Sequence, residues 1–398
     1  MNEKTSIINV IKFGGAFVAF IIGSGFATGQ EIMQFFSAFG INGIYGAFIS
    51  MALFVWTGVA IMCRGFDAKN DPVESAHPFD HWFIFSNEPG TPLYWVGKVI
   101  STVFEWFIPF FLFLVVCIMF SGAGATVDQY YGLGDTELFG IPFKWGCVFM
   151  AAVSLISVLF GLRRIIDIIG TLGPLTIFLT IFIAVGVLLQ DSSGLAKADA
   201  AVAQVGMNRA DGLPISLWWF AGILYVAYNV TGSVPFMAAM GANAKTRNEA
   251  FFGSIAGGVA LMLAGVLLVA AHLAYAGEVG TADVPNLILA DKLTGVLRTI
   301  FAVVLVGEIY STAAPMLWVA TDQVSKGLGF LLPEKLTKEG TIGYAVVAIA
   351  LTLIAYVVSL SDFWWLVGFI YPKMGYVGIF FFLCIAARQI YGLVNKKG

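Results

Sequence analysis

Long apolar runs recur along the whole chain, and short polar segments separate them. A helix needs about 20 apolar residues to cross the hydrocarbon core of a bilayer. These runs lack the strict alternation of membrane barrel strands, so we expect an all-α integral membrane protein. The pattern predicts about ten spanning helices in a single domain, 1–398, near 9–38, 41–63, 94–125, 142–161, 163–190, 215–240, 249–276, 294–326, 341–361 and 363–393.

The composition supports a membrane location. Charged residues make up 11% of the chain, 59% is hydrophobic and the mean hydropathy is +0.89, whereas a soluble domain carries about 25% charged residues. The net charge of -3 leaves no electrostatic basis for binding nucleic acid. The scattered Cys63, Cys117, Cys147 and Cys384 have neither disulfide nor zinc spacing. No cleavage site follows the first apolar run, so we interpret it as a spanning helix and not a signal peptide.

The distribution of Lys and Arg predicts the orientation. With the N-terminus inside, fifteen of the 21 basic residues fall in cytoplasmic segments and five in outside segments. Such a bias predicts that both termini are cytoplasmic, in a bacterial-type inner membrane. The cytoplasmic segment 65–92 contains His77 and His81, but Pro78 between them disfavours a helical metal site, and its role stays open. The outside segment 277–293 has the pattern of a short helical hairpin that could cover a vestibule.

Two of the predicted helices carry helix-weakening residues in mid-span. Gly23, Gly25 and Gly29 lie in the first helix, and Pro235 lies in the sixth. The two positions are about half a chain apart and an odd number of helices separates them, so the halves 1–190 and 215–398 form an inverted 5+5 repeat. Paired interruptions of this kind indicate a transporter site. The alternative is that the glycines serve helix packing.

An unwound turn at mid-membrane exposes backbone amides at one half-helix and carbonyls at the other, which attract anionic and cationic groups. A pocket of this kind with few charges favours a zwitterionic amino acid or a related small organic solute, with an additional aromatic wall at Trp219. The predicted substrate-binding residues are Gly23, Ser24, Gly25, Phe26, Met119, Ser121, Gly122, Tyr228, Asn229, Thr231 and Gly232.

The run from Gly23 to Ile32, GSGFATGQEI, resembles the first-helix signature of the YkvI-like family of proposed amino-acid permeases. The ten-helix plan is similar to that of the amino acid–polyamine–organocation superfamily, which has the LeuT fold. In sequence the resemblance is specific only around the first and sixth helices. It implies a 5+5 inverted repeat, a substrate site at the midplane and alternating access driven by an ion gradient. We therefore expect a symporter, with a small-molecule substrate and a coupling cation as partners.

The resemblance also implies a coupling-ion site. In LeuT-fold symporters, two adjacent hydroxyls on the eighth helix bind sodium together with first-helix carbonyls, and these correspond here to Ser311, Thr312, Ala19 and Ile22. Glu308 lies on the same helix face and leaves open whether the ion is sodium or a proton. A second sodium site is disfavoured because Phe26 replaces its usual amide. The fifth helix lacks the lysine of proton-coupled members, which favours sodium. Alternatively, both hydroxyls bond a carbonyl one turn back.

Three further charged residues fall within the predicted spans. Glu31 and Lys373 are expected to form an outer gating ion pair, although Lys373 could instead reach the outer interface. Glu105 could belong to an inner gate or to a polar vestibule. No catalytic constellation appears, so an enzyme is not expected. A channel would show rings of polar residues. A non-transporting sensor on the same fold stays open, as does the oligomeric state.

Overall fold

The computed structural model describes residues 5–71, 77–86, 88–133, 136–138, 141–160, 172–328 and 337–395. Helices dominate this part of the chain, with one small β-hairpin. The start of the fifth predicted span lies outside the described residues. The elements are α1 (Ile7–Ile21), α2 (Ser24–Thr28), α3 (Gln30–Phe35), η1 (Ser37–Phe39), α4 (Asn42–Asp67), α6 (Asp80–Phe83), α7 (Pro92–Tyr131), β1 (Thr136–Leu138), β2 (Ile141–Phe143), α8 (Trp145–Phe160), α10 (Leu172–Gln190), η2 (Ser193–Lys197), α11 (Ala198–Val205), η3 (Ala210–Gly212), η4 (Ile215–Leu217), α12 (Trp218–Ala242), α13 (Arg247–Ala274), α14 (Ala276–Val279), α15 (Pro285–Leu293), α16 (Gly295–Leu328), α18 (Ile342–Ser359) and α19 (Phe363–Asn395).

Several of these helices match the predicted spans in length and composition. Among the described residues, seven helices are long and apolar enough to cross a membrane: α4, α7, α12 with η4, α13, α16, α18 and α19. An eighth is reached if α10 is joined to the segment 193–205, across a bend of 80°. The apolar helices α1 and α8 are shorter. The structure thus confirms an all-helical membrane architecture, and the count of ten spans stays a prediction.

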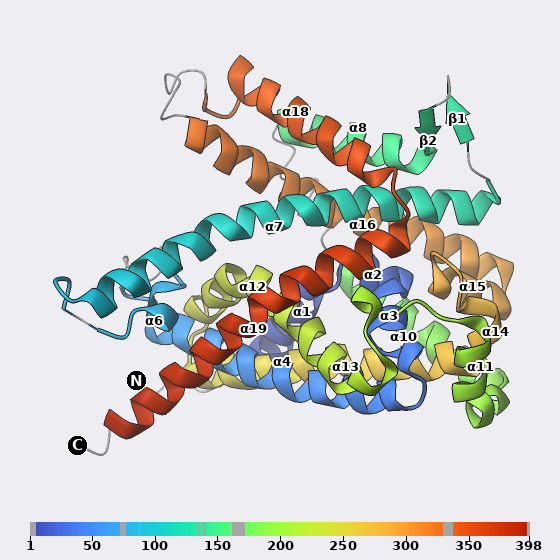
Figure 1. Ribbon diagram of the computed structural model, residues 1–398, viewed down its shortest axis with the longest axis horizontal. Helices are drawn as coiled ribbons and strands as arrows, with labels where there is room; N and C mark the ends of the chain where they lie inside the picture. The colour runs from blue at the N-terminus through green and yellow to red at the C-terminus, as the bar shows by residue number, and fades with distance from the viewer. Residues whose placement is uncertain are drawn as a thin grey trace.

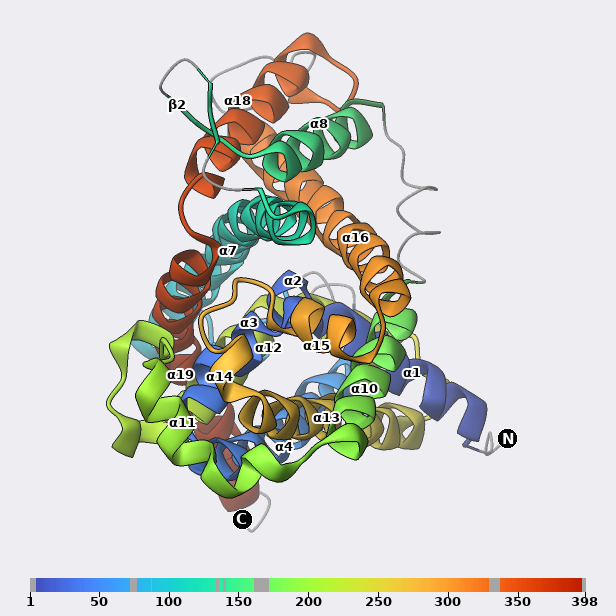
Figure 2. The same ribbon diagram turned by 90° about the vertical axis from the view of Figure 1, so that its right-hand side faces the viewer.

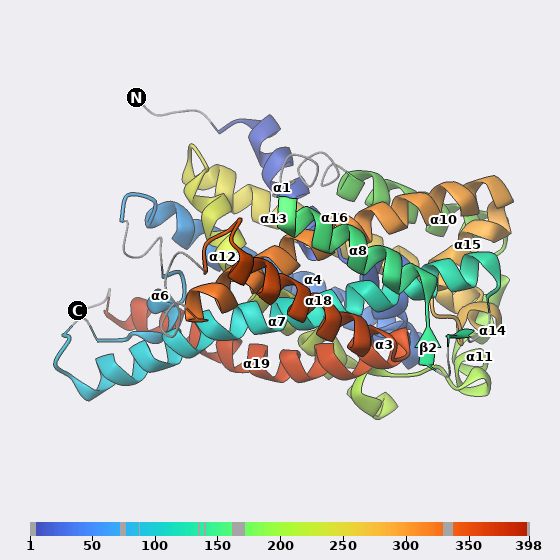
Figure 3. The ribbon, with the colours of Figure 1, turned by 90° about the horizontal axis from the view of Figure 1, so that it is seen from above.

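The helices pack in tiers around α2 and α3. The long helices α7 and α16 contact each other, and α8 and α18 pack on them from outside (Figures 1 and 3). On the other side α4 packs between α12 and α13, and α19 runs along α12. Seen along the bundle, α2 and α3 lie inside the ring of longer helices (Figure 2). We call the end that holds both chain termini the termini end, and the end with α14 and α15 the lid end.

The predicted interruption of the first helix is confirmed. The last turn of α1 closes with the Ile22 amide on the Val18 carbonyl, and Ile22 and Gly23 are extended before α2 begins. A second break follows at Gly29, whose φ of 91° lies in the left-handed region that favours glycine. A β-carbon there would also collide with Asn286 and crowd His272. The chain therefore crosses the middle of the bundle in three short helical pieces.

The predicted interruption of the sixth helix is wrong. Helix α12 runs without a break from Trp218 to Ala242, through Pro235. Proline removes one backbone donor, but packed neighbours and hydroxyl side chains can satisfy the freed groups inside a membrane helix. The carbonyl that loses its donor is that of Thr231, four residues before Pro235. The Thr231 and Ser233 hydroxyls bond other carbonyls of the same helix, those of Ala227 at 2.7 Å and Val230 at 3.0 Å. The helix nevertheless stays continuous through the proline.

The lid end carries the short elements. The helical hairpin predicted at 277–293 is confirmed as α14 and α15, which lie over α2 and α3 (Figure 2). The segment from η2 to η4 and the antiparallel hairpin of β1 and β2 lie at the same end (Figure 1).

Candidate functional site

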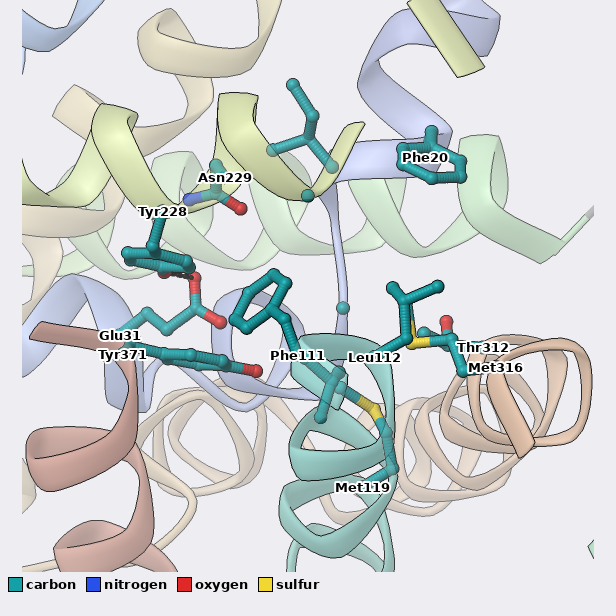
Figure 4. A pocket seen from close by; sticks show the side chains of 14 residues that line it. Phe20, Glu31, Phe111, Leu112, Met119, Tyr228, Asn229, Thr312, Met316 and Tyr371 are labelled. Atoms are coloured by element: carbon teal, nitrogen blue, oxygen red, sulfur yellow. Dashed lines mark hydrogen bonds between the residues drawn. The ribbon is translucent and has the colours of Figure 1, made fainter. Parts of the chain in front are cut away.

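A small cavity lies where the first helix is interrupted (Figure 4). It encloses about 50 Å³, and residues of α1, α3, α7, α12, α16 and α19 surround it. Five of the predicted substrate residues are among those that line it. The lining residues are Phe20, Ile21, Gly23, Glu31, Phe111, Leu112, Val115, Met119, Tyr228, Asn229, Gly232, Thr312, Met316 and Tyr371.

The helical period decides which residues of α12 face the cavity. Gly232 lies four residues after Tyr228 and three after Asn229, so these residues share one side of the helix. The ring of Phe111 fills the space that a side chain at position 232 would need. The Thr231 hydroxyl bonds its own helix, and Trp219 is 43% exposed on the surface. Neither residue lines this cavity.

The remaining predicted residues surround the break without lining the cavity. Gly25 and Phe26 are buried in α2, and Gly122 packs against Ser24 and Phe363. On α7, the Ser121 hydroxyl donates to the carbonyl of Ser361 at 3.0 Å. The Ser24 hydroxyl is fully buried and has no hydrogen-bond partner in the described structure. Buried polar atoms normally have one, so Ser24 presents an unsatisfied polar group beside the break.

Glu31 is the one carboxylate that lines the cavity. Glu31 is 3% exposed, and the Tyr228 hydroxyl donates to its Oε2 at 2.7 Å. The rings of Tyr228 and Tyr371 stack with centroids 4.4 Å apart. The Glu31 carboxylate lies beside them and is turned toward Phe111 (Figure 4). Position 25 must be glycine for this arrangement, because a β-carbon there would collide with the Glu31 side chain.

The predicted ion pair between Glu31 and Lys373 does not form. Lys373 lies on the outward face of α19, its side chain 44% exposed, and its Nζ donates to Asp211 Oδ1 at 2.7 Å. Asp211 belongs to η3, a segment that no pattern in the sequence places beside α19. For a long lysine side chain, reaching a partner at the surface costs less free energy than being buried.

The predicted coupling-ion residues come together only in part. Thr312 lines the cavity beside Phe20 and Ile21, near the end of α1. The last helical bond of α1 runs from the Ile22 amide to the Val18 carbonyl. The next carbonyl, that of Ala19, therefore has no helical amide partner. Ser311 does not line the cavity.

The hydroxyls of Ser311 and Thr312 donate to the Glu308 carbonyl, at 2.8 and 3.2 Å. This is the alternative stated above, in which both hydroxyls bond a carbonyl one turn back. The Glu308 carboxylate is 2% exposed and accepts from the Thr176 hydroxyl of α10 at 3.5 Å. It thus faces α10 and not the cavity. No group of three metal-ligating His, Cys, Asp or Glu side chains occurs in the described ranges.

At the termini end, Glu105 Oε1 lies 2.8 Å from His77 Nδ1. This contact ties α7 to the segment before α6, on the side where the sequence placed a possible inner gate.

Hydrogen bonds hold the lid hairpin against the interrupted helix. The Asn286 amide donates to the Ala27 carbonyl at 2.9 Å, and its Oδ1 lies 3.0 Å from His272 Nε2. Gln129 of α7 both donates to the Val284 carbonyl, at 2.8 Å, and accepts from its amide, at 2.9 Å. The lid is therefore held against α2, α7 and α13.

An acidic cavity of about 850 Å³ adjoins the lid. Its charged lining consists of four carboxylates and one ammonium group: Asp128, Glu137, Asp283, Asp362 and Lys144. Burial raises the pKa of Asp283; the nearby Lys144 opposes this shift and Asp362 adds to it.

No protein-family model matches the chain. It is 24% identical over 377 residues to the uncharacterized membrane protein YkvI of Bacillus subtilis, covering 94% of each chain. It is 22% identical over 378 residues to the uncharacterized protein YyaD of the same organism, covering 94% of this chain and 95% of that one. The crystal structure of MhsT in complex with L-phenylalanine superposes with a TM-score of 0.50 at 16% identity, covering 92% of this chain and 81% of that chain. The chain is therefore similar over almost its whole length to the YkvI-type membrane proteins and shares the fold of MhsT, the LeuT fold.

Proposed function

We propose that this protein is an ion-coupled secondary transporter that carries an amino acid or a related zwitterion across the membrane by alternating access. The observation that carries the proposal is the interrupted first helix, whose break lines a central cavity. The proposal includes ten spans in a 5+5 inverted repeat with halves 1–190 and 215–398, and a cytoplasmic membrane location with both termini inside. In this arrangement α12, the first helix of the second half, faces the interrupted helix of the first half across the cavity.

The lining matches the parts of a zwitterionic solute. The Glu31 carboxylate supplies a negative charge for an ammonium group, and the Tyr228, Tyr371 and Phe111 rings can surround a cation or an apolar side chain. The unsatisfied Ser24 hydroxyl and the amides at the start of α2 lie where a carboxylate would be held. An amino acid with a free ammonium group therefore fits better than an anionic solute.

The lining of the cavity can adapt to a solute, because two of its side chains are flexible. Met119 and Met316 are suited to this because unbranched thioethers adapt to different shapes.

We favour sodium as the coupling ion. The Thr312 hydroxyl donates to Glu308, which leaves its oxygen lone pairs available to a cation. The unpaired Ala19 carbonyl, with Ile22 beside it, would add backbone oxygens of the type that hard cations prefer. Glu308 is the group through which a proton could replace sodium, since a buried carboxylate in a span marks a functional site by default.

Transport into liposomes tests the proposal. The purified protein is reconstituted, and a labelled amino-acid panel that includes L-phenylalanine is offered under a sodium gradient, a proton gradient or neither. We expect accumulation above equilibrium that requires one gradient and collapses when an ionophore dissipates it. Passive equilibration without accumulation would indicate a channel, and saturable binding without flux would indicate a sensor. Either result contradicts the transporter proposal.

A further inference from the structure

Helix α3 is a short, separate piece of chain between the lid and the cavity. All six of its residues are buried, and the backbone leaves the helical conformation on both sides of it. Gly29 before it has a φ of 91°, and Phe36 after it has a φ of -133° and a ψ of -63°. A helix of this length is not stable by itself. The contacts of α3 with neighbouring elements therefore decide where it lies.

Two glutamines one turn apart connect α3 to the lid and to α19. Gln30 donates through Nε2 to the carbonyls of Ala282 and Asp283, in the turn of the lid hairpin, at 3.2 and 3.4 Å. Gln34 donates through Nε2 to Gln30 Oε1 at 3.3 Å and to the Trp364 carbonyl of α19 at 2.7 Å. We call Gln30 and Gln34 the glutamine ladder.

The glutamine ladder is buried and closely fitted. Gln30 is 1% exposed and Gln34 is fully buried. Position 368 of α19 must be glycine here, because a β-carbon on Gly368 would collide with Gln34 Oε1. That oxygen has no hydrogen-bond partner in the described structure, although buried polar atoms normally have one. A leucine would pack at this position without an unpaired atom, so the amide indicates a role beyond packing.

The same short helix carries the carboxylate of the cavity. Glu31 directly follows Gln30, and the Tyr228 hydroxyl donates to its Oε2 at 2.7 Å (Figure 4). Helix α3 is thus bonded to the cavity through Glu31 and to the lid through the residue before it. A shift of the lid therefore changes where the carboxylate lies, and a ligand on the carboxylate changes where the ladder lies.

We propose that α3 couples the lid to the substrate cavity, with Gln30 and Gln34 as positioning residues for the Glu31 carboxylate. The inference rests on the proposed function in one respect, that the ligand is an amino acid whose ammonium group pairs with Glu31. Binding of that group holds α3 against the lid, and the docked lid holds the carboxylate at the cavity. Such coupling is reciprocal and strengthens both equilibria by the same factor, typically about 5- to 150-fold.

A double-mutant cycle tests the coupling without any ligand. Tyr228→Phe keeps the ring stack on Tyr371 and removes the bond to Glu31, while Gln30→Leu removes the bonds to the lid. Hydrogen exchange of the lid, residues 280–293, is measured in the whole protein. We expect each variant to accelerate lid exchange about five- to tenfold, the value of one hydrogen bond, and the double variant to be no faster than Gln30→Leu. Accelerations that multiply, or no effect of Tyr228→Phe, overturn the proposal.

A second variant reaches the ladder from α19 and leaves α3 and the lid unchanged in sequence. Gly368→Ala places a methyl group against the Gln34 amide, so it should displace the ladder and accelerate lid exchange. Exchange in α18, which is remote from the lid, should stay unchanged and shows that the protein is folded. Normal lid exchange in Gly368→Ala contradicts the role of Gln34.

The matched control is Gln129→Leu. Gln129 bonds the lid from α7, through the main chain of Val284 at 2.8 and 2.9 Å, and no hydrogen bond in the described structure joins its side chain to α3. The variant should accelerate lid exchange, yet Tyr228→Phe should keep its full effect in this background. If the effect of Tyr228→Phe is lost there too, any loosening of the lid abolishes the coupling and the ladder is not specific.

An amino acid that binds in the transport assay gives a second readout. It should slow lid exchange about tenfold in the unmodified protein and in Gln129→Leu, and less than about twofold in Gln30→Leu. Slowing of equal size in Gln30→Leu overturns the coupling and leaves the transporter proposal standing. Ligand binding without flux contradicts the transporter proposal, and the ligand-free cycle still decides the coupling.

Discussion

Glu31 sits where a substrate's charge would be neutralised, and no cationic side chain lines the cavity with it. A buried carboxylate without a counter-charge costs several kcal/mol, and its hydrogen bond from Tyr228 offsets only part of this. Such a group is stabilised when a cationic ligand arrives. At the scale of single residues, the site is therefore incomplete until a cation or an ammonium group is bound.

Replacing Glu31 with Gln tests this role. The variant keeps the shape and removes the charge, so we expect amino-acid affinity to fall by about 2–5 kcal/mol, the cost of leaving one member of a buried charge pair unpaired. Scintillation proximity binding measures the loss. The control is Glu88→Gln, an exposed residue at the termini end, which should bind normally. Unchanged affinity in Glu31→Gln would place the ammonium group elsewhere.

The hydroxyls of α16 allow the coupling ion to be identified. Thr312 lines the cavity and Ser311 does not, so Thr312→Ala should weaken sodium dependence more than Ser311→Ala. We expect roughly a five- to tenfold loss of sodium affinity for Thr312→Ala, about the value of one polar contact. Glu308→Gln should leave sodium dependence intact. If Glu308→Gln abolishes pH dependence while both hydroxyl variants keep full activity, the ion is a proton.

At the scale of elements, the lid hairpin is the part most clearly held by specific bonds. Asn286 bridges α15 to the end of α2 and to His272 of α13. Removing it leaves the Ala27 carbonyl and the imidazole without that partner inside the protein. The closed lid should therefore lose stability relative to the open one.

We expect Asn286→Ala to destabilise lid closure by about 1–3 kcal/mol, the cost of unsatisfied buried polar groups. Hydrogen exchange across residues 280–293 should accelerate, with the rest of the bundle unchanged. Asn243→Ala, an exposed asparagine at the termini end, provides the control. Uniform acceleration in all helices would mean that the variant is globally destabilised and that Asn286 is not a lid contact.

The lid should also respond to pH through Asp283. Its pKa is raised in the folded protein, mainly by burial, so the folded state binds the proton more tightly than the unfolded chain. Protonation then favours the packed lid, and its stability should fall as pH rises through the interval above the ordinary aspartate pKa. Hydrogen exchange of 280–293, compared at pH 5 and pH 8 after correction for intrinsic exchange, measures this. Asp283→Asn should remove the dependence; if the variant keeps it, another group is responsible.

At the scale of the whole molecule, the alternation of helices places both termini at one end, where Arg64, Arg247 and Arg388 also gather. The excess of basic residues predicts that this end is cytoplasmic. A tag fused after Gly398 should be inaccessible to impermeant reagents in intact cells and accessible after permeabilisation. A cysteine at Gly206, exposed at the lid end, should label from outside and serves as the internal control. Labelling of the tag in intact cells would reverse the topology.

The sequence alone determined the membrane class, the helical runs, the lid hairpin and the break at Gly23. These features are local: a run of apolar side chains long enough for a bilayer, or several glycines within about two turns, leaves few alternatives. Four cavity residues, Gly23, Tyr228, Asn229 and Gly232, also followed from their position beside the two predicted interruptions, and Met119 followed from its place in the outer half of the third predicted helix.

Only the tertiary structure decided the rest. Pro235 predicted a break, but α12 runs through it as one continuous helix packed against α4 and α19. Lys373 lies against Asp211, 162 positions away, and no local pattern encodes that distance. In the sequence, nothing distinguishes Tyr371 and Phe111 from the other aromatic residues of long helices. They line the cavity because α19 and α7 converge on the break. The sequence specifies the chemistry of each side chain, but the packing of the helices decides which charges and rings come into contact.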